Sequence, residues 1–521
     1  MGVYTKGCLL AHTRRRSGVQ ISHRPRRRKY LFYIDKVKAT SVAFFSTTYL
    51  QKYSKLIQMS RKPQNGGLKW GPFVARIPFI HIRFRAAEFF QGIAISGATA
   101  FAGVPIVMGM GLTFEEGVAV ALIAGTLIAA GPILFGVPFA PGWITPAYPI
   151  VLIFFATMGY YSPSGVEYQP ETFQFMAALC IEFTLLVALL GMTGLSGKII
   201  NNIPNTLKSG IILGAAVAAF YQVFFKEFDS RYMEQPIAMT VALAICILTT
   251  FSEPFKRLAA SNKIFQKISS LGLLPGFLIA AAVAYLFGEA TLGEVAGRPI
   301  YQEGISFGLT FPEVVKLFER TSPFSDQVGF PPLKMYLEAL PLVIIGYILL
   351  FGDIITGKAI LNDAEKERPD EPLDVDVNKV HLSIAVRNFL GLIANPNFPT
   401  QGALWTGVHV VVAERWRKGA KEMPSIFDGL GSYYLMAIPF LYVWQPFIVF
   451  MGPLMSIALN LTLVLTGFAC AYVALAIPKT NAEMSSALLI GLLVAFSGEY
   501  VWAALLIGIL LSVFVVGFGK K

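Results

Sequence analysis

The sequence predicts an all-α polytopic membrane protein with about 14 transmembrane segments arranged as two inverted repeats of seven. Three observations predict this class. The 521-residue chain is 55% hydrophobic and 14% charged, with a mean hydropathy of +0.60, whereas a soluble protein of this length needs more charge to cover its surface. Apolar runs of about 20 residues, the length of a membrane span, recur along the chain. Two Pro/Gly-rich stretches, 136–149 and 395–407, interrupt them at matching positions.

The N-terminal 86 residues form a separate basic tail. Residues 1–62 contain 15 Lys or Arg and one acidic residue, Asp35, whereas the whole chain has a net charge of +12, so the basicity belongs to this leader. We expect residues 1–86 to be disordered, or to include a mis-assigned start with the true first residue at Met59. A transit peptide is the alternative, because the leader contains Arg and Ser and is poor in acidic residues. A nucleic-acid-binding patch is the least favoured interpretation, because no fold accompanies the charge.

Apolar runs bounded by helix-breaking residues define the two repeats. The first repeat covers 87–288, a polar extracytoplasmic loop covers 289–335, and the second repeat covers 336–518. The segments expected in the first repeat are 87–110, 113–135, 143–160, 172–192, 207–226, 236–252 and 270–288. The segments expected in the second repeat are 336–360, 379–394, 399–415, 430–450, 451–476, 482–497 and 499–518.

Loop charge gives the orientation. If the N-terminus is cytoplasmic, the loops after even-numbered segments should be basic. The basic residues of the loops after segments 4, 6, 10 and 14 are Lys198, Lys208, Lys256, Arg257, Lys263, Lys267, Arg415, Arg417, Lys418, Lys421, Lys520 and Lys521. The acidic loop after segment 8 has little influence on orientation. We therefore expect an integral protein of a bacterial inner (plasma) membrane with both termini in the cytoplasm.

The two interruptions open the third segment of each repeat. They read GVPFAPGWITPAYP (136–149) and NPNFPTQGALWTG (395–407). Proline blocks helix continuation and makes the preceding residue extended, so both segments 3 and 10 should open with a short extended stretch. Such backbone is tolerated at membrane depth only inside protein or beside a watery cavity. Paired interruptions of this kind are typical of inverted-repeat secondary transporters, in which free helix N-termini face an anion or a hydrogen-bonding solute.

Over roughly residues 85–518 this pattern resembles the superfamily of xanthine/uracil permeases and sulfate permeases. NFLGLIANPNFPTQGALWTGVHVVVAERW (388–416) is similar to the nucleobase permeases' Gly-rich stretch that precedes a proline and Thr-Tyr-Gly-Glu-Asn. EFFQGIAISGATAFAGVPIVMG (88–109) is similar to their first span, which carries a Gln near its start. Ala403 falls where those permeases hold their base-binding Glu, and the sulfate permeases usually carry a regulatory domain after the last span, where this sequence ends. We therefore expect a side branch of the superfamily.

The resemblance implies a core of segments 1–4 and 8–11, a gate of segments 5–7 and 12–14, and a homodimer. It also assigns a role to Asp353 in segment 8, because that segment carries the acid that binds substrate or takes the coupling proton in this superfamily. An ionisable residue within a span is a functional candidate in its own right. The alternative is that Asp353 lies near the cytoplasmic end of the span and is simply hydrated.

The remaining candidates for solute binding come from the interrupted segments and from segment 1. They can supply aromatic walls, hydroxyls and amides to a mostly apolar pocket, although each alone fits packing equally well. One candidate is a glycine, Gly402, which would let the backbone approach the solute closely. These candidates are Phe398, Thr400, Gln401 and Gly402, then Trp143, Thr145 and Tyr148, and finally Gln91 and Ser96.

These features predict a secondary active transporter of a small anionic or planar polar solute, working by alternating access with H⁺ or Na⁺ as coupling ion. The alternatives are an inorganic-anion permease of sulfate or molybdate type, and a channel or motor-like protein without carrier cycling. An enzyme is not expected, because the sequence contains no His-Glu-x-x-His motif, nucleophile elbow or phosphate loop. We expect no cofactor, no metal and no nucleic-acid partner; the solute and the lipid bilayer are the expected partners.

Overall fold

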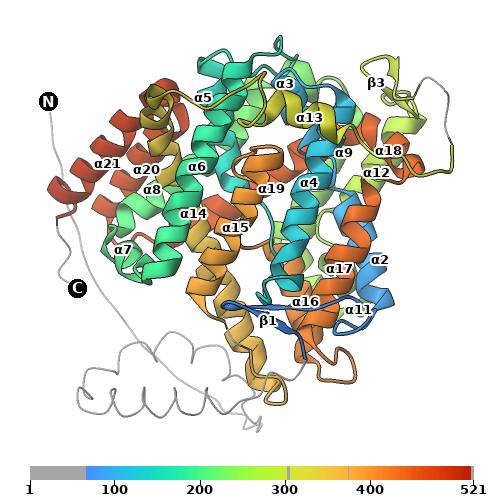
Figure 1. Cartoon of the computed structure of the whole chain (residues 1–521). Coiled ribbons are helices and arrows are strands. Elements are labelled where there is room, and N and C mark those ends of the chain that lie inside the picture. The colour runs from blue at the N-terminus through green and yellow to red at the C-terminus, as the bar shows by residue number, and fades with distance from the viewer. Residues whose placement is uncertain (1–65, 302–305, 374, 518–521) are drawn as a thin grey trace, which may run out of the picture. The chain divides into compact units, whose positions relative to one another are not determined.

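The computed structural model describes residues 66–301, 306–373 and 375–517, and the regular structure of this part of the chain is almost all helix (Figure 1). The helices of its first half are α2 (Ala86–Gly97), α3 (Val104–Gly109), α4 (Phe114–Ile133), α5 (Tyr148–Thr157), α6 (Pro170–Thr193), α7 (Ser196–Asn202), α8 (Asn205–Tyr221), α9 (Pro236–Phe251), α10 (Glu253–Ser261), α11 (Lys263–Ser270) and α12 (Leu274–Leu286). The later helices are α13 (Val314–Thr321), α14 (Leu333–Ala364), α15 (Val377–Ala394), α16 (Thr406–Arg417), α17 (Ile426–Leu441), α18 (Gln445–Met451), α19 (Met455–Ala476), α20 (Asn481–Phe496) and α21 (Val501–Phe514).

Each of the 14 predicted segments overlaps at least one of these helices, and the all-α class is confirmed. By length and composition, five of the described helices can cross a membrane, or up to seven if each of two bent helix pairs counts as one span. Others are shorter apolar helices, among them 145–157 and 426–441. Extended backbone does open segments 3 and 10, so that α16 begins at Thr406 and not at residue 399.

Two predicted segments have different boundaries for local reasons. Segment 1 is interrupted between α2 and α3. A Cβ on Gly103, just before α3, would lie 2.8 Å from the Trp143 ring, so the aromatic side chain packs closely against the backbone there. Segment 11 was expected over 430–450, but α17 begins at Ile426, where the Ser425 side chain caps it by accepting a hydrogen bond from the Phe427 amide. Helix α17 ends at Leu441, two residues after Pro439.

The expected tail boundary at residue 86 is too late. Residues 68–75 form an antiparallel hairpin of β1 (Leu68–Trp70) and β2 (Phe73–Ala75). The hairpin is held against the end of α4, because the Trp70 indole donates to the Leu134 carbonyl at 2.7 Å and the Arg76 amide to the Ile133 carbonyl at 2.7 Å. The Arg76 guanidinium is buried 3.6 Å from the Phe427 ring centroid, and this burial lowers its pKa to about 10. Residues 1–65 lie outside the described part, and the expectations about them stay untested.

The predicted loop 289–335 also contains regular structure. The hairpin of β3 (Glu294–Val295) and β4 (Arg298–Pro299) is followed by α13. Arg320 in α13 donates to the buried Glu116 carboxylate of α4 at 2.7 Å, and its guanidinium stacks over the Tyr168 ring. The loop is therefore fixed to the first repeat by an ion pair that sequence periodicity does not reveal.

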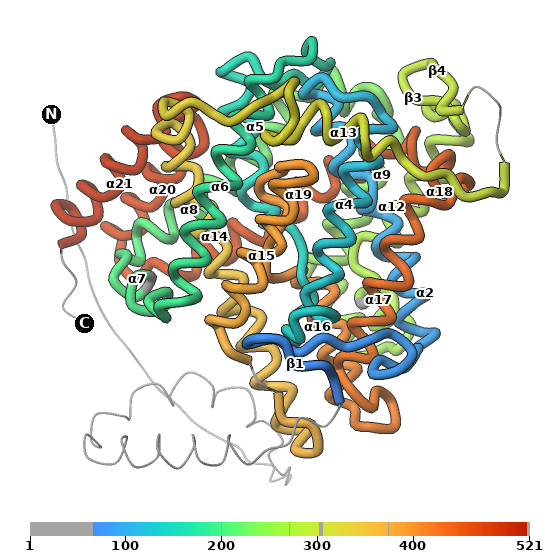
Figure 2. The backbone as a smooth tube through the Cα atoms, viewed as in Figure 1, coloured from blue at the N-terminus to red at the C-terminus, as the bar shows by residue number. Residues whose placement is uncertain are grey.

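The helix packing repeats itself between the two halves. Helix α6 packs on α15 and α14, and its counterpart seven segments later, α17, packs on α4 and α2. In the same way α8 packs on α20, and its counterpart α19 packs on α9. Figure 2 shows the late helices α20 and α21 beside the early helix α8, so the two repeats interleave instead of forming separate domains. We call α2–α6 and α14–α17 the core group, and α8–α12 and α19–α21 the gate group.

Candidate functional site

The two Pro/Gly-rich segments lie side by side; we call the pair, 136–144 and 395–405, the crossing. Three backbone hydrogen bonds join them. The Ile144 amide donates to the Pro399 carbonyl at 2.9 Å, the Gly402 amide to the Gly142 carbonyl at 2.8 Å, and the Trp405 amide to the Ala140 carbonyl at 2.7 Å. The residue numbers rise in one segment as they fall in the other, so the pairing is antiparallel. The two broken segments predicted from sequence therefore meet in space.

Glycine makes this approach possible. A Cβ on Gly402 would lie 2.7 Å from the Gly142 carbonyl oxygen, and a Cβ on Gly142 would lie 2.9 Å from the Trp405 Cβ. A half-helix starts after each strand: a 3-10 turn (Thr145–Ala147) leads into α5, and α16 begins at Thr406. The first amides of these helices have no intrahelical partner, so positive potential gathers at both ends of the crossing.

Helix α14 supports the crossing through two glycines. The Phe398 ring lies where a side chain on Gly346 would be, and Phe139 and Leu404 pack over Gly357. The two glycines are eleven residues apart, which is three helical turns, so they lie on one face of α14. The same face therefore receives side chains from both strands of the crossing.

Asp353 belongs to this face of α14. It follows Gly346 by seven residues and precedes Gly357 by four, which places it within about 40° of both around the helix. The side chain is half-buried, and within residues 66–301, 306–373 and 375–517 no hydrogen bond or ion pair engages it. Cys470 of α19, in the gate group, is near enough to interact with it electrostatically. Asp353 thus lies on the face directed to the crossing and near a gate helix.

His409 in α16 connects three parts of the site, a role that its sequence context did not reveal. Its Nδ1 accepts the Ala140 amide at 3.2 Å, and its Nε2 contacts the Gly357 carbonyl oxygen at 3.2 Å. This pattern requires the neutral tautomer with the proton on Nε2. The ring is fully buried, so His409 fixes both strands to α14. The described residues contain no cluster of three or more His, Cys, Asp or Glu side chains that could hold a metal ion.

Arg387 in α15 is the site residue that sequence reasoning missed. Its guanidinium donates to the Gln401 side-chain oxygen at 3.3 Å and to the Gly402 carbonyl at 2.9 Å. It is buried, its Nε has no acceptor, and no carboxylate lies within ion-pair distance in the described part of the chain. The available signal was a charged residue in the middle of the apolar segment 379–394, where the other charged residue, Lys379, stands at the end.

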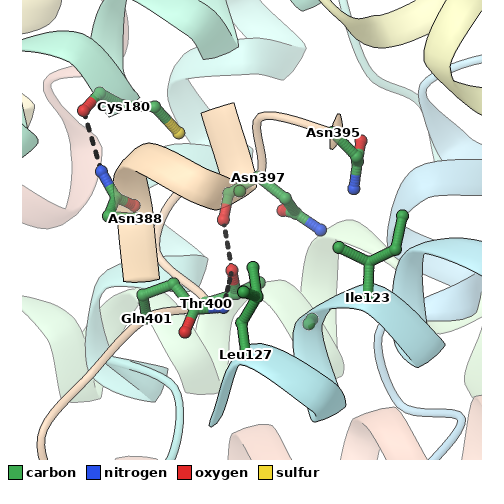
Figure 3. A pocket seen from close by; sticks show the side chains of 10 residues that line it. Ile123, Leu127, Cys180, Asn388, Asn395, Asn397, Thr400 and Gln401 are labelled. Carbon is green, nitrogen blue, oxygen red and sulfur yellow. Dashed lines mark hydrogen bonds between the residues drawn. The ribbon is translucent and has the colours of Figure 1, made fainter. Parts of the chain in front are cut away.

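A narrow hollow, shown in Figure 3, is bounded by α4, α6, α15 and the second strand of the crossing. Its volume is ≈ 10 Å³, about enough for one water molecule. The residues that border it are Ile123, Ala124, Leu127, Cys180, Asn388, Gly391, Asn395, Asn397, Thr400 and Gln401. Thr400 and Gln401 were predicted; the three asparagines were not. The Thr400 hydroxyl already donates to the Asn397 carbonyl at 2.6 Å, so part of this polar lining is satisfied within the protein.

The other predicted residues are distributed around the crossing. Tyr148 is buried, its hydroxyl donates to Asn397 at 3.5 Å, and its ring centroid lies 5.3 Å from that of Trp143. Thr145, at the start of the 3-10 turn, is half-buried. Phe398 is fully buried against Phe183 and α14, so it contacts only protein in this conformation.

Segment 1 contributes unequally. Ser96 is buried and donates to the Tyr433 hydroxyl at 3.1 Å; the neighbouring Tyr434 hydroxyl donates to the Pro141 carbonyl of the crossing at 2.7 Å. Gln91 is half-buried and lies about 140° from Ser96 around α2, so the two do not share a face. The structure thus brings Ser96 into contact with Tyr433, whose ring centroid lies 6.3 Å from that of Trp405 in the crossing.

A buried polar network joins the core to the gate at a distance from the crossing. Glu227 and Arg231 form an ion pair at 3.2 Å in two π-helical turns (Gln222–Lys226 and Phe228–Tyr232) that follow α8. Arg231 donates to the Pro105 carbonyl at 3.0 Å and to the Tyr161 hydroxyl at 2.9 Å, and that hydroxyl donates to Glu227. All three charged or phenolic side chains are buried. This Glu227 network ties the segment between α8 and α9 to α3 and to the loop after α5.

Comparisons with known proteins find a likeness among solved structures. No protein-family model matches the sequence, and no curated protein sequence matches it. Among solved structures, the fold is similar to the transmembrane domain of a cyanobacterium bicarbonate transporter, BicA. The identity is 14% and the TM-score 0.43, over 83% of this chain and 98% of that one.

Proposed function

We propose that this chain is a secondary active transporter that carries a small solute by alternating access. The crossing supports this most. Two broken segments from matching positions of two repeats pair antiparallel, and a half-helix begins after each. Irregular backbone among apolar helices is tolerated where it lines a solute site, and two such segments mark the site in inverted-repeat transporters.

The charges near the crossing favour an anionic solute. Arg387 is a buried cation whose hydrogen-bond partners are neutral oxygens, those of the Gln401 side chain and the Gly402 carbonyl. A buried charge without an opposite charge is costly, and an anion near the crossing would lower that cost. The free amides that begin α5 and α16 act in the same direction. A planar polar solute is the second possibility within this proposal, because Trp143, Thr400 and Gln401 can stack and hydrogen-bond.

Asp353 is the residue to which we assign ion coupling. It lies on the α14 face that carries the crossing, has no protein partner among the described residues and lies near Cys470 of the gate group. A carboxyl group in that position can bind H⁺ or Na⁺ in one state and release it in another, and so link an ion gradient to the movement of the core against the gate. The Glu227 network would have to open and close during this cycle, because it joins the two groups.

A thermal-unfolding screen of the purified protein tests the proposal. The panel is uracil, xanthine, ascorbate, sulfate, molybdate, benzoate and bicarbonate. A solute present at about 100 times its dissociation constant should stabilise the folded protein by roughly 2.7 kcal/mol. Asp353→Asn should abolish or weaken the shift. Asp363→Asn is the matched control, since Asp363 lies on the same helix but is exposed and paired with Lys366 at 2.8 Å.

Uptake into proteoliposomes separates a carrier from a channel. A carrier gives saturable uptake that an imposed H⁺ or Na⁺ gradient accelerates, and Asp353→Asn should remove this acceleration. Flux that rises linearly with solute concentration and ignores the ion gradient would contradict the proposal and favour the channel alternative. If the solute still raises the unfolding temperature of Asp353→Asn, then the crossing alone binds the solute and Asp353 is not part of the binding site.

A further inference from the structure

We infer that the helical hairpin α10–α11 binds the surface of an anionic lipid membrane. The inference stands apart from the proposed function, because the hairpin lies in the gate group and contributes no residue to the crossing. Helix α10 follows α9 after Ser252 alone, and α11 is joined to α12 by three residues, 271–273. The chain bends by 61° between α9 and α10 and by 77° between α11 and α12. The hairpin thus turns away from the direction of the two apolar helices where they end.

Both short helices have one apolar and one basic face. In α10, Phe255 and Leu258 are one turn apart, whereas Lys256 and Arg257 are directed elsewhere. In α11, Ile264 and Ile268 share a face, and Lys263 lies on the opposite side. A basic, strongly amphipathic helix is typical of segments that lie in the membrane interface.

The apolar faces are only partly covered by protein. Phe255 and Phe265 contact each other edge to face at 5.8 Å and hold the two helices together. Leu258 is 49% exposed and Ile264 is 69% exposed, on neighbouring helices of the same hairpin. These side chains can enter the acyl region only if the hairpin lies flat at the ends of α9 and α12, which the two bends permit.

The charge specifies the kind of lipid. Between residues 252 and 270 the basic side chains are Lys256, Arg257, Lys263 and Lys267, and the only acidic residue is Glu253, so the segment carries three net positive charges. The side chains of Ser252 and Asn262 cap the N-termini of α10 and α11, so these basic residues lie on helices with defined starting points. Each basic residue near an anionic surface strengthens association about fivefold, whereas a zwitterionic surface offers no such gain.

Thiol accessibility in lipid nanodiscs tests this inference on the full chain. Ile264→Cys is labelled with a membrane-impermeant maleimide in discs of phosphatidylglycerol and in discs of phosphatidylcholine. Gln266→Cys, on the polar face of the same helix, is the matched control, and the parent protein gives the background of its native cysteines. Labelling of Ile264→Cys should be at least about tenfold slower in phosphatidylglycerol, whereas Gln266→Cys should react equally in both.

Charge variants connect the protection to the basic residues. Adding Lys256→Gln, Arg257→Gln and Lys263→Gln to Ile264→Cys should remove the difference between the two lipids, whereas Lys256→Arg with Lys263→Arg should retain it, which excludes misfolding as the cause. Equal labelling in both lipids, or a difference that survives the triple substitution, would overturn the inference. Protection that arises only after a soluble acidic protein is added would also overturn it, in favour of a protein partner.

Discussion

Replacing Gly402 by alanine should disrupt the crossing for a purely steric reason. The φ angle of Gly402 is outside the left-handed region, so alanine can adopt its backbone conformation. The added Cβ would lie 2.7 Å from the Gly142 oxygen, 2.8 Å from the Trp143 carbonyl carbon and 2.9 Å from the Ile144 nitrogen. All three are backbone atoms, so the strands themselves must separate.

The magnitude follows from what this separation costs. Overpacking of a tight interior costs about 1–3 kcal/mol. The hydrogen bonds that Gly402 and Ile144 donate across the crossing, at 2.8 and 2.9 Å, would lengthen, and each contributes about 0.5–1.5 kcal/mol. We therefore expect Gly402→Ala to lower the free energy of unfolding by about 2–6 kcal/mol. Gly142→Ala should act similarly, and the double variant should cost less than the sum, because either change alone already separates the strands.

The assay is equilibrium unfolding in mixed micelles with increasing sodium dodecyl sulfate. Gly407→Ala is the matched control: it lies five residues further on, in α16, and a Cβ there would meet only the Trp405 indole nitrogen, at 3.9 Å. Alanine in a helix is better than glycine by up to about 1 kcal/mol, so this control should be neutral or stabilising. The reasoning is refuted if the two variants have the same free energy of unfolding.

Two further changes test the charged clusters. Glu227→Gln leaves Arg231 buried without its carboxylate and should lower the free energy of unfolding by about 3–5 kcal/mol. Glu313→Gln, in an exposed pair, should change it by less than about 1 kcal/mol. Equal effects of the two variants in the same detergent unfolding assay would contradict the buried network. Burial raises the pKa of the Glu371 carboxyl above its ordinary value of 4.5, so the folded state binds this proton more tightly than the unfolded state and stability falls as pH rises above that value. Glu371→Gln should flatten this decline in unfolding temperature and Glu367→Gln, which is exposed, should not.

The sequence by itself determined the helices and the breaks. Hydropathy and proline act over a few residues, so apolar runs identify spans, and Pro396 follows directly on the end of α15 at Ala394 and its cap Asn395. Thr400, Gln401 and Gly402 lie at the second break for this reason. The boundary at residue 86 failed because the β1–β2 hairpin is fixed by its contact with the end of α4, not by local hydropathy.

Only the tertiary structure decided which side chains meet. Arg387 and Gln401 are 14 positions apart, but Ala140 and His409 are 269 apart and Tyr161 and Glu227 are 66 apart. No local pattern carries such pairings, because a buried polar group selects its partner by geometry and by the cost of having none. Sequence alone could mark Asp353 as an unusual charge in a span. Asp353 shares a face of α14 with Gly346 and Gly357. Only the structure shows that these two glycines pack against the two strands of the crossing, which places Asp353 beside it.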